Sequence, residues 1–323
     1  MIINESKINL WSKLGSRATF GQALLSVAED NPNVLAMSAD LGNSSGLKPF
    51  IRKYPSKFIN VGIAEQNLIG VAAGLAKEGF VPYVTSFAPF LSMRASEQIR
   101  MELGYMQFNV KVVALGSGLA MGFLGNSHYG LEDVSVMRAI PGLTVVSPAD
   151  CTEIVKVVQA AAHHKGPMYI RLTGGVNNPI VYKNDYKYEL GKAIKLKDGD
   201  DIAIVCSGTM VHQSLQAAAE LAESNIHAEV INMHTIKPLD TAKLEALVAS
   251  GKPLVSVEEH TIVGGLGSAI AEFLTTLKKH VPHKIIGLED KFGKTAQYEH
   301  LLKLHGLNSS GIANSVRLFL DDL

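Results

Sequence analysis

Cysteine is scarce in this chain. The 323 residues include only two cysteines, Cys151 and Cys206, which are too few for a disulfide framework. Both stand in apolar segments, as is typical of buried thiols in a reducing compartment. The first residues also lack a basic region followed by an apolar one, so the sequence predicts no secretory signal. We therefore expect a soluble, cytoplasmic protein.

An excess of one charge and long apolar runs are missing as well. Lys and Arg together number 30, and Asp and Glu also number 30, so no general attraction to nucleic acid or anionic membrane is expected. No apolar run reaches the roughly 20 residues that span a bilayer. Hydrophobic residues make up 47% of a chain long enough for two ordinary domains, which indicates a globular protein.

The motifs of several common sites are absent too. No spacing of His, Cys, Asp or Glu matches a structural zinc site, and we expect no metal ligands in this chain. Residues 116–122 contain three glycines after an apolar run, but the third comes one position late for a dinucleotide-binding fingerprint. The G-x-S-x-G elbow of many hydrolases is not present.

Apolar runs alternate with helical patterns along most of the chain. Strands are expected at 34–40, 81–86, 110–115, 143–147, 168–172, 201–206, 228–232, 253–257 and 284–288. Helices are expected at 8–31, 65–76, 87–106, 151–163, 210–224, 241–250 and 265–280. This alternation predicts α/β architecture with a doubly wound parallel sheet. A polar, glycine-containing stretch divides the chain into a domain over 1–175, a linker over 176–192 and a smaller α/β domain over 193–323.

One acidic residue, Glu65, stands where an apolar strand becomes a helix. Residues 58–76 begin strand-like, pass through Gly62, and show an apolar helical face from Glu65 onward. Position alone favours a solvent-exposed acid that complements the helix dipole. The alternative is a carboxylate at the carboxyl end of a parallel strand, where open α/β sheets bind ligands.

Other residues also have ordinary interpretations when considered singly. A lone loop histidine such as His128 is usually a surface residue, and Phe87 and Phe90 fit an apolar core. Arg17 fits a solvated charge on a helix. Residue type and spacing alone therefore leave the function open.

Several segments together resemble the transketolase group of thiamine-diphosphate enzymes. They are Gly62-x-x-Glu65, Ser38-Ala-Asp40-Leu41, His128-x-x-x-Glu132-Asp133 and Ile140-Pro-Gly142. Residues 15–175 resemble the pyrimidine-binding domain of that family, and residues 190–323 resemble its carboxyl-terminal domain. The G-D-G…N motif that binds the diphosphate and its metal is missing. The chain thus resembles the carboxyl-terminal half of a split transketolase.

The resemblance implies a role for each matching residue. Glu65 would hydrogen-bond the aminopyrimidine ring of thiamine diphosphate and activate the cofactor, which requires a buried carboxyl group. His128 would contact the substrate and exchange protons with it. Phe87 and Phe90 would hold the pyrimidine ring. A further set completes the implied site: Asp40 and Arg94 for the cofactor, and Arg17 and Ser44 for the phosphate of the substrate.

The implied enzyme transfers a two-carbon ketol unit from an anionic ketose to an aldehyde. Its Mg²⁺ or Ca²⁺ ligands would lie on a partner, the amino-terminal subunit with the G-D-G…N motif, in an α2β2 assembly. Two alternatives remain open from the sequence: the β subunit of a 2-oxo acid dehydrogenase complex, which shares the two-domain layout, and a non-catalytic interaction subunit.

Three positions depart from the common transketolase pattern. Gly116 stands where a His usually contacts the donor, Leu124 where an Asp reads an acceptor hydroxyl, and Gly174 where an Arg holds phosphate. These departures predict a modified ketose substrate rather than the standard pentose phosphates.

Overall fold

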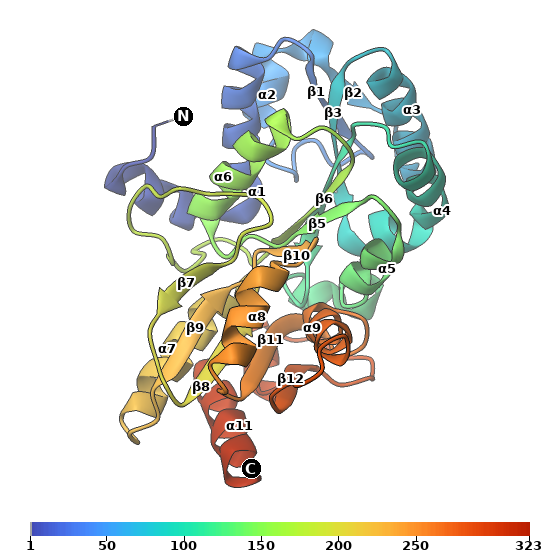
Figure 1. Ribbon diagram of the computed structural model, residues 1–323. Coiled ribbons are helices and arrows are strands. Elements are labelled where there is room, and N and C mark those ends of the chain that lie inside the picture. The colour runs from blue at the N-terminus through green and yellow to red at the C-terminus, as the bar shows by residue number, and fades with distance from the viewer. Residues whose placement is uncertain (1) are drawn as a thin grey trace.

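Two β-sheets follow one another along the chain in a computed structural model that describes residues 2–323 (Figure 1). The first, seven-stranded sheet has the strand order β10-β5-β6-β4-β3-β1-β2. The second, five-stranded sheet has the order β12-β11-β8-β9-β7. The predicted α/β class is confirmed.

The first sheet is parallel over six of its strands. These are β1 (Val34–Ser38), β2 (Phe58–Asn60), β3 (Val81–Phe87), β4 (Lys111–Ser117), β5 (Thr144–Val146) and β6 (Met168–Thr173). Every residue of β1, β4, β5 and β6 is buried, as expected for strands with helices on both faces. The predicted doubly wound parallel sheet is confirmed for these strands.

Helices cover both faces of this sheet. One face packs against α1 (Glu5–Asp30), α2 (Lys48–Lys53) and α6 (Cys151–His163). The other face packs against α3 (Glu65–Lys77), α5 (Asp133–Ala139) and the helical segment around α4 (Ser96–Gln98). The sheet therefore lies between two layers of helices.

Two predicted helices differ from the structure. The helix expected at 8–31 is interrupted at Gly15, whose φ of 82° is favoured only by glycine. A Cβ at this position would also overlap the backbone of Gly175. The helix expected at 87–106 starts later and consists largely of two π-helical segments, Phe90–Arg94 and Ile99–Tyr105. Four of its buried apolar residues recur every fourth position, at 91, 95, 99 and 103, a spacing that a wider turn accommodates.

The second sheet has its own helical layers. Its strands are β7 (Ile194–Lys197), β8 (Ile202–Cys206), β9 (Ala228–Asn232), β11 (Leu254–Thr261) and β12 (His283–Leu288), and β7 runs antiparallel to β9. One face packs against α7 (Met210–Ala222), α10 (Tyr298–Leu304) and α11 (Ser309–Asp321). The other packs against α8 (Thr241–Ala249) and α9 (Leu266–Thr275), which share one apolar core with the first sheet.

One strand crosses between the two parts of the chain. β10 (Thr235–Lys237) follows β9 of the second sheet in sequence but pairs antiparallel with β5 at the edge of the first sheet (Figure 1). No pattern in the sequence predicted this strand, because three residues are too few to show a period. The predicted domain boundaries stay a prediction.

The predicted linker, 176–192, has no helix or strand, but some of its side chains make specific contacts with both parts of the chain. Tyr182 stacks on Tyr186 with ring centres 3.9 Å apart. The Tyr186 hydroxyl donates to Glu153 of α6, and Asn232 of β9 donates to the Tyr182 hydroxyl at 2.8 Å. The segment therefore bridges the two sheets.

A buried ion pair also joins the two parts. The Nε atom of Arg171 in β6 donates to both carboxylate oxygens of Asp133, the first residue of α5, at 3.0 and 2.9 Å. The Nη2 atom of Arg171 donates to the carbonyl oxygens of Gly130 and Glu259, each at 2.9 Å. Because Glu259 belongs to β11, one guanidinium connects both sheets with the chain that precedes α5.

This geometry predicts a large loss of stability for Asp133→Asn. The variant keeps the side-chain shape but leaves Arg171 buried without its counter-charge, which should lower the free energy of unfolding by about 3–5 kcal/mol. Urea unfolding of the isolated chain measures the change. The control is Glu189→Gln, which breaks the exposed Lys187–Glu189 pair and should cost less than about 1 kcal/mol. Equal losses would contradict the account.

Candidate active site

The parallel strands of the first sheet all end at the same edge. Asp40 follows β1, Glu65 follows β2, Phe87 ends β3, and Gly116 lies at the end of β4. Open α/β sheets bind ligands at the carboxyl ends of their strands. The fold thus brings residues that are distant in sequence to one place where a ligand is expected.

Glu65 is buried at the start of α3. Its side chain is 2% exposed, which excludes the exposed helix-end interpretation. The Oε1 atom accepts a hydrogen bond from the Ser86 hydroxyl at 2.9 Å, and Oε2 accepts one from Nη1 of Arg94 at 2.7 Å. The carboxylate is therefore oriented by a strand on one side and by a half-exposed guanidinium on the other.

Three aromatic rings pack edge to face beside Arg94, one of the two residues that bind the Glu65 carboxylate. Phe87 and Phe90 have ring centres 6.0 Å apart, and His128 lies 5.5 and 5.3 Å from them. The Arg94 guanidinium lies 4.5 Å from the centre of the Phe90 ring, a cation–π contact that links the rings to Glu65. All three rings are half-buried, so each keeps part of its surface accessible to a ligand.

His128 reaches this cluster from a loop after β4. A 3₁₀ turn over Gly122–Ser127 comes just before His128. The Nδ1 atom of His128 lies 2.9 Å from the Ser127 hydroxyl, and the imidazole ring contacts Phe87 and Phe90. The imidazole thus borders the aromatic cluster with one nitrogen already engaged, an arrangement suited to proton exchange with a ligand.

Asp40 lies at the same edge but makes its hydrogen bonds elsewhere. Its backbone N–H donates to Oδ1 of Asn60 at 2.9 Å, and Nδ2 of Asn60 donates to its carboxylate at 3.1 Å. The residue is exposed, with a φ of 59° that Asp tolerates better than most residues. Asn60 thus holds Asp40 at the strand ends rather than in contact with Glu65.

Arg17 and Ser44 line a separate cleft of about 380 Å³. Its walls come from α1 on either side of Gly15, the loop after β1 and the residues after β6. The Ser45 hydroxyl donates to the Thr85 hydroxyl of β3 at 3.0 Å. Because Thr85 lies two residues before Phe87, this bond connects the cleft wall to the strand that carries the aromatic cluster.

The three positions that depart from the transketolase pattern border these two regions. A Cβ on Gly116 would lie 3.6 Å from the Phe87 ring. Leu124 is half exposed in the turn before His128. Gly174 accepts a hydrogen bond from Ser16, the neighbour of Arg17, at 3.2 Å. Their alignment with the family's substrate-contacting residues stays a prediction.

Sequence reasoning missed the two residues that orient the acids. Ser86 donates to Glu65, and Asn60 holds Asp40. A polar residue at the carboxyl end of an apolar strand was the available signal in both cases, since Ser86 is the next-to-last residue of β3 and Asn60 ends β2.

The residues present fit one half of a thiamine-diphosphate site. A buried carboxyl group beside half-buried aromatic rings suits a planar, nitrogen-containing ring such as an aminopyrimidine. Among residues 2–323, no three His, Cys, Asp or Glu side chains are grouped so that they could hold a metal ion. In the same described part of the chain, no helix is long and apolar enough to cross a bilayer.

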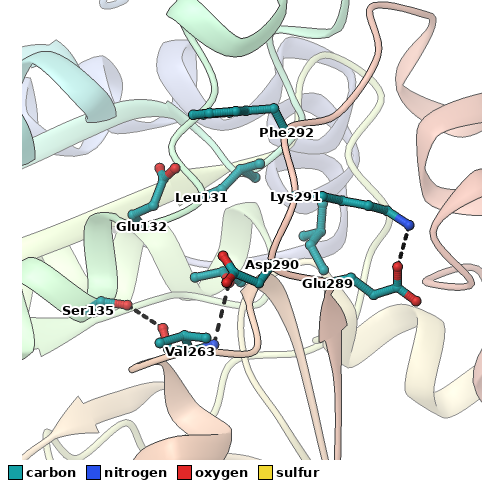
Figure 2. A pocket seen from close by; sticks show the side chains of 10 residues that line it. Leu131, Glu132, Ser135, Val263, Glu289, Asp290, Lys291 and Phe292 are labelled. Atoms are coloured by element: carbon teal, nitrogen blue, oxygen red, sulfur yellow. Dashed lines mark hydrogen bonds and ion pairs between the residues drawn. The ribbon is translucent and has the colours of Figure 1, made fainter.

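A further hollow, of about 370 Å³, lies between α5 and the ends of β11 and β12 (Figure 2). Leu131, Glu132, Ser135 and Phe292 are among its lining residues. Figure 2 shows the Ser135 hydroxyl donating to the carbonyl oxygen of Val263, a bond of 2.6 Å. None of the predicted site residues lines this hollow, so it is distinct from the candidate active site.

Comparison with protein families accounts for most of the chain. The transketolase pyrimidine binding domain matches residues 12–176, and the transketolase C-terminal domain matches residues 191–312. The first match contains Glu65, the aromatic cluster and His128.

Individual relatives agree with these matches. The chain is 38% identical over 305 residues to a putative transketolase C-terminal section of Methanocaldococcus jannaschii, covering 94% of this chain and 95% of the relative. It is 39% identical over 300 residues to a 6-deoxy-6-sulfo-D-fructose transketolase subunit of Clostridium sp. (strain MSTE9), covering 93% and 92%. A solved structure, described as a split gene transketolase in an inactive β4 tetramer, is 37% identical with a TM-score of 0.86, covering 95% and 98%.

Proposed function

Because the chain belongs to the transketolase family, we propose that it supplies the pyrimidine side of a thiamine-diphosphate site as the carboxyl-terminal subunit of a split transketolase. With a partner it transfers a two-carbon ketol unit from a ketose to an aldehyde. The observation that carries the proposal is the buried Glu65 beside Phe87, Phe90 and His128.

The two alternatives left open by the sequence have less support. The relatives described above carry transketolase names, which favours this activity over that of a 2-oxo acid dehydrogenase β subunit. A non-catalytic interaction subunit would have no use for a buried carboxyl group oriented by Ser86 and Arg94.

Each residue of the candidate site has a proposed task. Thiamine diphosphate, when bound, supplies a carbon nucleophile that also accepts electrons. Glu65 holds a proton toward the pyrimidine ring, with Ser86 fixing the direction of its carboxyl group. Phe87 and Phe90 exclude water from the ring, and His128 holds or moves a proton at a substrate oxygen.

Two charged residues assist the binding of the cofactor. Arg94 contacts both Glu65 and the Phe90 ring, so its position affects how the ring of the cofactor enters. Asp40, held by Asn60, presents an exposed carboxylate at the same edge of the sheet. We assign both to the cofactor side of the site.

The second half of the site comes from a partner subunit with the G-D-G…N motif, which binds the diphosphate and Mg²⁺ or Ca²⁺. The surface beside Glu65 supports this assignment. Ile63 and Met93 are exposed apolar side chains there, and a Cβ built on Gly70 or Gly74 of α3 would meet nothing within 4 Å. A backbone from another chain can therefore approach α3 closely, and we propose an α2β2 assembly.

The substrate is an anionic ketose with a modified carbon skeleton or head group. Arg17 and Ser44 hold its anionic end in the cleft after Gly15. The glycines at 116 and 174 and the leucine at 124 remove contacts that the common pentose phosphates use. The name of the Clostridium relative, a sulfofructose transketolase subunit, supports an anionic group other than a plain pentose phosphate.

We place the enzyme in the cytoplasm. Cys151 and Cys206 are both free and buried, and burial raises the pKa of each thiol to about 12. Such thiols are inert and suit a reducing compartment.

The proposal predicts that Glu65→Gln abolishes turnover while the assembly with the partner persists. Gln can accept from Arg94 at its amide oxygen and donate from its NH₂ group to the Ser86 hydroxyl, but it cannot exchange a proton, so kcat should fall at least about 100-fold. Turnover of the reconstituted complex and size-exclusion chromatography measure the two effects. Glu78→Gln, at the exposed end of α3, is the matched control. Turnover near the wild-type rate would refute the role of Glu65.

The substrate proposal predicts that the standard pentose-phosphate pair is a poor substrate. An apolar residue opposite a substrate hydroxyl costs about 1–3 kcal/mol, and a lost charge-assisted phosphate contact costs a similar amount, which together reduce kcat/KM about 100-fold or more. A panel of branched, deoxy, sulfonated and ordinary ketoses on the reconstituted complex tests this. Leu124→Asp should raise kcat/KM for the pentose pair about tenfold. If the pentose pair is already the best substrate of the unmodified complex, the alignment of these positions is wrong.

A further inference from the structure

The loop that carries His128 is buried at its two ends, where Leu119 and Tyr129 join an apolar core, and exposed at its turn. This His128 loop, residues 118–130, begins and ends at a bridge in which Gly118 and Gly130 exchange backbone hydrogen bonds of 2.9 and 3.3 Å. Phe123 and Leu124 at its turn are exposed, with 76% and 49% of their surface accessible. An exposed turn opens readily, so the position of His128 depends on the contacts that hold the two ends of the loop.

Glu259 provides one such anchor from the second sheet. Its Oε1 atom accepts the backbone N–H of Leu119 at 2.6 Å. Its Oε2 atom accepts the hydroxyl groups of Thr209 at 2.6 Å and Tyr298 at 2.7 Å. The side chain is buried, and burial raises the pKa of its carboxyl group. A carboxyl group this deeply buried is tolerated because each oxygen has a hydrogen-bond donor.

The same carboxyl group determines the path of the loop backbone. Gly118 has a φ of 71°, and a Cβ at that position would overlap the side chain of Glu259. Glycine is therefore required at 118 while Glu259 occupies its present place. The first residues of the His128 loop thus lie directly against the carboxyl group.

The segment before α10 holds the other side of the loop. Nδ2 of Asn126 donates to the carbonyl oxygen of Gly293 at 2.8 Å, and the Gly293 N–H donates to Oδ1 of Asn126 at 3.0 Å. The Tyr129 hydroxyl donates to the carbonyl oxygen of Lys294 at 2.9 Å. A few residues later α10 begins at Tyr298, whose hydroxyl binds Glu259. The His128 loop is therefore held at two places by the second part of the chain: by Glu259 at Leu119, and by residues 293–294 at Asn126 and Tyr129.

We propose that Glu259 is a positioning residue for the transketolase reaction. Its carboxyl group fixes Leu119 and thereby keeps His128 against Phe87 and Phe90. This inference rests on the role proposed above for His128. Because a displacement of about 1 Å at a reacting group costs on the order of 100-fold in rate, an anchor distant from the substrate affects kcat.

The test compares Glu259→Gln with Glu259→Ala in the reconstituted complex. The Gln amide oxygen still accepts from Leu119, and its NH₂ group donates to the hydroxyls of Thr209 and Tyr298, so the anchor remains. We expect Glu259→Gln to keep kcat within about threefold, and Glu259→Ala to lower kcat about tenfold or more with little change in KM. If the Gln variant loses as much kcat as the Ala variant, charge rather than position is responsible and the proposal fails.

Hydrogen exchange of backbone amides separates this role from general stability. Glu259→Ala should speed exchange in residues 118–130. The matched control is Glu258→Ala, which removes a buried carboxylate that accepts the N–H groups of Leu266 and Gly267, and which should speed exchange at the start of α9 instead. Unchanged protection of the His128 loop in Glu259→Ala, or equal loosening in the control, would overturn the proposal.

A milder variant covers the case in which Glu259→Ala does not fold. Tyr298→Phe removes one donor to Glu259 and should speed exchange in the His128 loop to a smaller degree. No change there would contradict the anchor. Because exchange needs no turnover, a complex without transketolase activity would refute the proposed function while leaving the anchor fully testable.

Discussion

The buried pair of Arg171 and Asp133 is the contact on which the rest of the structure depends. The guanidinium donates to the first residue of α5, to the carbonyl that ends the His128 loop and to the carbonyl of Glu259 in β11. A buried charge is stable only when its partners are all in place. Removing any acceptor of the Arg171 guanidinium therefore loosens both the contact between the two sheets and the end of the His128 loop. In the arrangement that we propose, the candidate site needs the second sheet even though none of its proposed contact residues lies there.

Much of the fold was predictable because parallel strands that are covered on both faces are continuous apolar runs. The strands at residues 110–115 and 168–172 were found this way. What failed depended on contacts between distant segments. The break at Gly15 exists because the backbone of Gly175 passes beside it, and β10 exists because three residues meet the edge of β5. Neither contact leaves a periodic signal in the local sequence.

The candidate site was predictable from residue identities combined with family resemblance, but not from position alone. Glu65 at a helix start has the pattern of an exposed acid, and only the Ser86 and Arg94 contacts explain why it is buried. His128 joins the aromatic cluster because a loop returns over β3, which spacing in the sequence cannot indicate. The sequence cannot indicate that Glu259 anchors this loop, since 140 positions separate Glu259 from Leu119.

We propose that this chain forms only half of a cofactor site. Isothermal titration calorimetry with thiamine diphosphate and Mg²⁺ tests it most directly, on the isolated chain and on the chain mixed with the amino-terminal subunit. We expect weak or undetectable binding by the chain alone and tight binding by the mixture. Tight binding by the isolated chain would contradict the claim that the diphosphate and its metal are held by a partner.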